Sequence, residues 1–139
     1  MDIESSGYRH PLVTKFGRWL VSRVRDRTIE VFDAALDHTI RDPILPQSSL
    51  RIIETLSAQQ KEMLTNVLAD VVTYTIGVFV SELEQSRDID VIVRDGNTVG
   101  NMRELSYSLL SEMYGEDGWV AAYSTKRVSQ YYASDDVVY

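Results

Sequence analysis

The chain has 139 residues, carries a formal net charge of −7 and contains no cysteine. The missing thiols exclude disulfides, cysteine-ligated zinc and a cysteine nucleophile. Only two histidines, His10 and His38, are available for acid–base chemistry or metal binding. Because 44% of the residues are apolar and the length is that of a common domain, we expect one domain over 1–139. Its tails would be 1–10 and 125–139.

The charge is unevenly distributed along the chain. Residues 1–47 hold seven basic and seven acidic side chains, whereas residues 48–139 hold seven basic and fourteen acidic ones. An acidic half argues against nucleic-acid binding, which needs clustered lysine and arginine, and it favours a basic protein partner. The start of the chain is polar, with Asp2 and Glu4, so it does not resemble a signal peptide, and a cytoplasmic location is expected.

The first predicted element is a long helix from Pro11 to Arg41. Its apolar side chains recur every three or four positions, which is the helical period. They are Val13, Phe16, Leu20, Val24, Thr28, Val31 and Ala35. The pattern fits either one helix or two helices with a bend near Arg25. A stripe of this length needs to be covered by other helices or by a second copy of the chain.

A second helical region follows the prolines at 43 and 46. A short helix is predicted over 49–56, and Ser57 with Gln60 then forms a capping-box pattern for a new helix. The apolar residues from Met63 to Leu83 continue this helix, although the β-branched middle could also be a buried strand. The run 71–80 is about half a membrane span, so it is interpreted as a buried core segment.

The pattern changes to alternation at Asp88. A β-hairpin is predicted over 88–100, with Asp95-Gly96 as its two-residue turn. Asn101 then precedes a helix whose apolar face spans Met102 to Met113, and Gly115 ends it. A turn and a short buried element of either type, 119–123, come next. The predicted fold class is therefore α+β, mostly α: a helical bundle with a small antiparallel hairpin.

Two polar groups on the first helix are candidate sites. Glu30, Asp33 and Asp37 share a helical face beside His38. Carboxylates together with a histidine are the ligands that a metal-dependent hydrolase uses. The Glu-x-x-His pairs of di-metal bundles are absent, so a solvated face is the simpler interpretation, and we expect neither metal nor cofactor. The basic stretch could bind an anion or, more simply, pair with nearby acids. It comprises Lys15, Arg18, Arg23, Arg25 and Arg27.

The C-terminal region holds the predicted interaction residues. Glu116 and Asp117 lie on a glycine-flanked turn beside Trp119, which either contributes to a binding site or anchors the turn in the core. Tyrosines follow, and tyrosine is favoured at interfaces because it is large and loses few rotamers. The predicted set is Glu116, Asp117, Trp119, Tyr123, Tyr131, Tyr132 and Tyr139.

Three short motifs together resemble those of a group of small, uncharacterised bacterial proteins. They are Arg25-Asp26-Arg27-Thr28-Ile29-Glu30, Asp95-Gly96-Asn97, and Glu116-Asp117-Gly118-Trp119-Val120 followed by Tyr123-Ser124. The resemblance spans most of residues 20–125. By size and composition it implies an accessory or immunity-type cytoplasmic protein, and it implies no catalytic residue.

Three functional hypotheses follow from the sequence. The preferred one is a non-enzymatic protein-interaction module whose acidic C-terminal half binds a basic protein. The second is a small metal-dependent hydrolase that uses the acidic face of the first helix. The third is a structural homo-oligomeric subunit, such as a homodimer, whose contact is the long N-terminal stripe.

Overall fold

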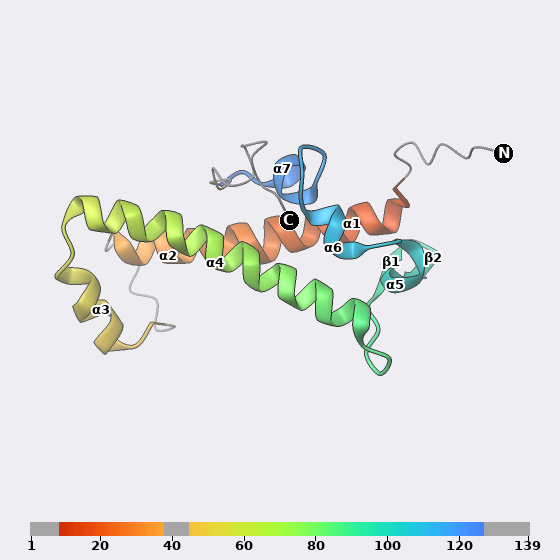
Figure 1. Ribbon diagram of the computed structural model, residues 1–139, viewed down its shortest axis with the longest axis horizontal. Coiled ribbons are helices and arrows are strands. Elements are labelled where there is room, and N and C mark those ends of the chain that lie inside the picture. Colours follow the sequence, from red (N-terminus) through yellow and green to blue (C-terminus); the bar gives the residue numbers. More distant parts are fainter. Residues whose placement is uncertain (1–8, 38–44, 127–139) are drawn as a thin grey trace.

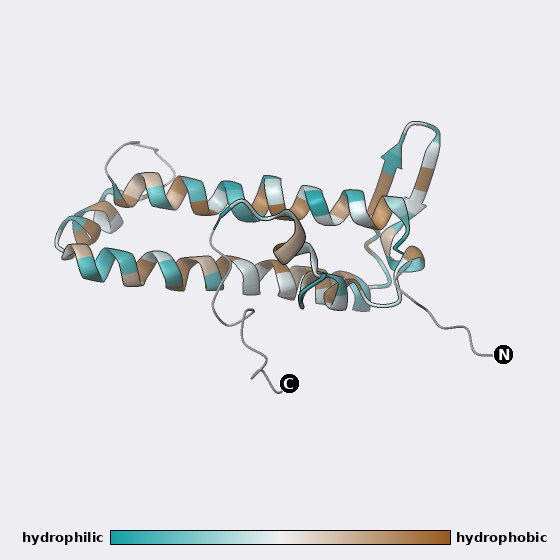
Figure 2. Cartoon of the chain, turned by 90° about the horizontal axis from the view of Figure 1, so that it is seen from above, coloured by the Kyte–Doolittle hydropathy of each residue, from teal (hydrophilic) through white to brown (hydrophobic). Residues whose placement is uncertain are grey.

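The computed structural model describes residues 9–37 and 45–126 of the chain. Two long helical segments lie side by side (Figures 1 and 2). The first consists of α1 (Pro11–Trp19), the wider π-helical turn η1 (Leu20–Arg25) and α2 (Asp26–Leu36), and the second is α4 (Ala58–Gln85). The short α3 (Gln47–Glu54) lies at one end of this pair (Figure 1).

The remaining elements pack at the other end of the helical pair and along its middle (Figure 1). They are the hairpin strands β1 (Ile92–Asp95) and β2 (Thr98–Asn101), and the short helices α5 (Met102–Leu105), α6 (Leu109–Met113) and α7 (Trp119–Tyr123). The two strands form an antiparallel sheet of their own. The predicted fold class, α+β and mostly α with a small hairpin, is confirmed.

The first segment begins as the sequence predicts, but its apolar stripe changes phase. The His10 Nδ1 atom accepts a hydrogen bond from the Leu12 backbone N–H (3.2 Å), and proline occupies the first turn. Buried residues are spaced by four up to Leu20, and the next one on that face is Arg25, five positions later. A π-helical turn contains an extra residue, so it rotates the face by one position. Val24 and Thr28, predicted for the stripe, are consequently only half-buried.

The second segment is a helix throughout, which excludes the strand alternative for 71–80. The Ser57 hydroxyl accepts from the Gln60 N–H (3.2 Å), and the Gln60 side chain accepts from the Ser57 N–H (2.8 Å). This reciprocal capping box confirms the predicted start of the helix. The interpretation of 71–80 as a buried segment is right for one face only. Thr73, Ile76 and Val80 are buried on the face toward α2, η1 and α6, whereas the opposite face is exposed.

The hairpin is shifted relative to its prediction. Asp95 pairs with Thr98 in the ladder, so the two turn residues are Gly96 and Asn97 and not Asp95-Gly96. Gly96 has a φ of 58°, which glycine adopts at little cost. Lys15 on α1 holds the turn end of β1 by donating to the Arg94 carbonyl (2.8 Å) and pairing with Asp95 (3.3 Å).

The helix predicted over 102–113 is two helices. α5 ends at Leu105, and the Ser108 hydroxyl starts α6 by accepting from the Ser111 N–H (3.2 Å). Serine competes with the backbone for hydrogen bonds, which favours such a break. Glu84 of α4 also accepts from the Leu109 N–H, so the first turn of α6 is attached to α4. Met102, Leu109 and Met113 nevertheless all reach the core, as the shared periodicity predicts.

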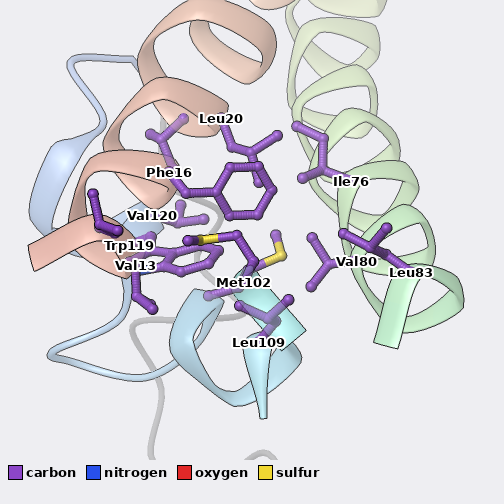
Figure 3. Close-up of a cluster of buried hydrophobic side chains, with 13 residues drawn as sticks. Val13, Phe16, Leu20, Ile76, Val80, Leu83, Met102, Leu109, Trp119 and Val120 are labelled. Carbon is purple, nitrogen blue, oxygen red and sulfur yellow. The ribbon is translucent and has the colours of Figure 1, made fainter. Parts of the chain in front are cut away.

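Trp119 is the largest fully buried side chain of the described residues, and it lies in the main core cluster (Figure 3). Its side chain is 0% exposed and meets the Phe16 ring edge-on, with 5.9 Å between ring centroids. Residues from α1, η1, α4, α5 and α6 complete the same cluster of buried side chains. Gly17 allows this approach, because a Cβ there would lie 2.3 Å from the indole ring. The alternative that Trp119 anchors the preceding turn in the core is therefore what the structure shows.

We predict that Gly17→Ala destabilises the protein by about 1–3 kcal/mol, because the added methyl overlaps a buried ring that has no room to move. At an exposed helical position a glycine-to-alanine change normally stabilises a protein by roughly 0.5–1 kcal/mol. A loss of stability at Gly17 would therefore show that the added methyl group meets the indole ring. Gly77→Ala is the matched control: its Cβ would meet the hydroxyl at the far end of the half-buried Tyr114 side chain, and not the body of a fully buried ring. Urea unfolding of both variants measures the difference, and equal losses would contradict this account.

Candidate interaction surface

The rotated face of η1 places a charged pair in the interior. Arg25 is 0% exposed, and its Nη1 atom lies 2.8 Å from Oδ1 of Asp26, which is also buried. The Arg25 Nε atom donates to the Thr73 hydroxyl of α4 (2.8 Å), which in turn donates to the Ala69 carbonyl (2.8 Å). The guanidinium thus joins the first helical segment to the middle of α4.

The chain that follows α7 completes this buried cluster. The Ser124 hydroxyl accepts from Arg25 and donates to Asp26 Oδ1, each at 2.8 Å, and the Thr125 N–H donates to Asp26 Oδ2 (2.8 Å). Three segments that are distant in the sequence therefore meet at one ion pair. Its donors and acceptors satisfy one another, which is the condition under which a buried charged group is tolerated.

The basic stretch is largely used within the fold. Besides Arg25, Lys15 pairs with Asp95, and Arg27 pairs with Glu30 at 3.2 Å. The Arg18 guanidinium stacks over the Tyr123 ring, 5.1 Å from its centroid, which fixes α7 against α1. These contacts agree with the simpler interpretation of pairing within the chain.

We predict that Asp26→Ala lowers the free energy of unfolding by about 3–5 kcal/mol, because it removes the carboxylate that is paired with a buried guanidinium. The double variant Arg25→Met, Asp26→Leu removes both charges and is expected to lose less than Asp26→Ala alone. Glu30→Ala is the control, since an exposed pair contributes no more than about 1 kcal/mol. Urea titrations of the three variants provide the comparison. An Asp26→Ala loss no greater than that of Glu30→Ala would refute the role of the pair.

The acidic face of α2 does not form a metal centre with the residues that the structure describes. Glu30 and Asp37 are exposed, Asp33 is half-buried, and His38 lies outside the described residues. Within 9–37 and 45–126, no group of three potential ligands is arranged to hold a metal ion. Farther along the chain, Asp90 has a lowered pKa because the Asn101 side chain and Arg103 donate hydrogen bonds to it, which is the behaviour of a surface ion pair.

The predicted C-terminal interaction residues have different environments. Glu116 and Asp117 are exposed on a tight turn between Gly115 (φ 90°) and Gly118, whereas Trp119 is buried and unavailable to a partner. Tyr123 is half-buried beneath Arg18. The predicted residues Tyr131, Tyr132 and Tyr139 lie outside the described residues.

The outer face of α4 is the largest apolar feature that the sequence interpretation missed. Val67, Val71 and Tyr74 are 55%, 52% and 71% exposed, although their residue types are those of a core. The exposed large apolar side chains of the helix are Met63, Val67, Val71, Tyr74, Val78 and Phe79. The core residues of α4, such as Thr73, Ile76 and Val80, lie on the opposite face. We call the set Leu64, Val67, Val71, Tyr74 and Val78 the outer seam; Leu64 is half-buried and the other four are exposed.

The outer seam has the spacing of a helix-packing surface. Its members follow one another by three, four, three and four residues, which is the heptad pattern of helices that pack along their length. Charge is scarce beside it, since Asp70 is the only ionised side chain between Glu62 and Glu82. Among the described residues α4 is also the one helix long and apolar enough, by length and composition, to cross a membrane.

The N-terminal stripe, in contrast, is covered by the chain itself. Val13, Phe16 and Leu20 belong to the core around Trp119, so they are not the assembly contact that the third hypothesis assigned to them. Sequence reasoning treated all apolar positions of α4 as one broad buried face. The apolar positions of α4 in fact form two sets on opposite faces, one facing the core and one with the heptad spacing of the outer seam. Recognising this second spacing in the sequence would have distinguished the two faces.

Comparison with protein-family models, with curated proteins and with solved structures found no significant match to this chain. The resemblance to small bacterial accessory proteins therefore rests on the three short sequence motifs alone.

Proposed function

We propose that this protein is a non-enzymatic protein-interaction module, and that the outer seam of α4 binds a helix. The observation that carries the proposal is an apolar, nearly uncharged strip with heptad spacing on the exposed side of a well-anchored helix. An exposed patch of this kind typically marks an interaction site. Helix packing in a groove or along a seam is a common mode of protein recognition.

The acidic C-terminal half supports a second contact with a basic protein, as the sequence predicts. Glu116 and Asp117 are exposed, and they lie on a turn fixed to the core by Trp119. Acidic residues on a rigid turn steer a basic partner toward the surface, and this attraction weakens as salt rises. A cytoplasmic location belongs to the same proposal.

Site-specific photo-crosslinking tests the helix-binding surface. We predict that a benzoyl-phenylalanine at Val71 in the full chain forms a covalent adduct with a protein when producing cells are irradiated, because a partner helix covers this position. The matched control carries the same residue at Arg23, which is exposed on the first helical segment and away from the outer seam. The control is expected to give no defined adduct.

Mass spectrometry of the crosslinked peptides identifies the partner. An adduct at Val71 with any single defined protein supports the proposed function. The absence of an adduct at Val71, with the protein folded and the photo-residue incorporated, would overturn it.

A further inference from the structure

We infer that the occupant of the outer seam is the α4 helix of a second copy of this chain, which makes the protein a two-fold symmetric homodimer. The inference rests on the proposed function and names the partner of that surface. The outer seam is a set of apolar residues in heptad spacing, and its best complement is another helix with the same spacing. Every copy of the chain presents one, and a two-fold interface pairs the same patch on both subunits.

The length of the outer seam is sufficient for such a pairing. From Leu64 to Val78 the helix rises about 21 Å at roughly 1.5 Å per residue. The exposed apolar side chains of α4, counted with Met63 and Phe79 outside the seam, together present an area on the order of 500 Å², which is as large as the largest patch on typical monomers. With the polar atoms beside the seam, two copies would approach the roughly 800 Å² per partner of a standard stable interface.

Electrostatics permits the pairing although each copy carries a net charge of −7. Between Glu62 and Glu82 the only ionised group is Asp70, so the contact itself brings one carboxylate from each copy near the interface. The exposed acids at 116 and 117 are on a different part of the molecule, beyond α6, and stay available to another partner. Like-charge repulsion between copies is screened over about 8 Å at physiological salt.

A lipid bilayer is a less suitable occupant of the same face. Helices that bind membrane surfaces carry lysine and arginine beside the apolar strip. α4 instead has Lys61 as its one cation, against Glu62, Asp70, Glu82 and Glu84. Its inner face is also bonded to the buried Arg25 through Thr73, so the helix cannot be surrounded by lipid without breaking the fold.

Sedimentation velocity over a range of concentrations tests the dimer with the full chain. The unmodified protein is expected to sediment as a dimer. The variant Val71→Glu, Tyr74→Glu is expected to be a monomer, with dimerisation weakened at least about a hundredfold, because each copy would bury two unpaired carboxylates. The matched control is Ile52→Glu, Ile89→Glu, which adds the same charge at apolar positions that are exposed outside α4. It is expected to stay dimeric.

Circular dichroism and flotation with phosphatidylcholine–phosphatidylglycerol vesicles accompany the experiment. Both double variants should keep the helical signal, because all four positions are exposed in the chain itself. A monomeric unmodified protein, a monomeric control variant, or flotation that depends on Val71 and Tyr74 would each overturn the dimer. A monomer whose photo-residue at 71 reacts with another protein would overturn the dimer and leave the proposed function intact.

Discussion

The buried pair of Arg25 and Asp26 is the constraint on which the arrangement of the molecule depends. A guanidinium that is taken out of water needs a counter-charge and hydrogen-bond acceptors from all sides. Here they come from the first helical segment, from Thr73 of α4 and from the chain after α7. The pair therefore fixes which face of α4 is turned inward. Hydrophobic burial alone would not choose that face, because α4 is apolar on both sides.

That choice determines what the protein offers to others. Because Thr73, Ile76 and Val80 face the interior, the apolar side chains on the opposite side of α4 are exposed to solvent. The core around Trp119 is complete without it. The outer seam is thus a property of a folded chain whose hydrophobic core is already filled, which is why we assign it to recognition and not to incomplete packing. The acidic turn at 116–117 is a separate surface, held in place by the same tryptophan.

Local signals in the sequence were sufficient for much of the fold and for little of the site. The capping box of Ser57 and Gln60 predicted the start of α4, and alternation with a glycine turn predicted the hairpin. Arg25 was not predicted to be buried, because a regular helical period places Val24 on the inner face. Apolar residues all around α4 cannot reveal which side the fold covers. Ser108 broke the predicted helix over 102–113, because its capping hydrogen bond competes with helix continuation.

The wide turn η1 also has a consequence for how the chain tolerates changes in length. Such a turn accommodates one residue more than a regular helix, so the segments before and after it each keep their own register toward α4. Removal of an outward residue such as Ser22 would convert the turn into ordinary helix and leave Leu20 and Ile29 facing inward. The same deletion within α2 would rotate Leu36 away from the interior. Residues 20–25 can therefore absorb the loss of one residue while the helices before and after them keep the same faces toward the core.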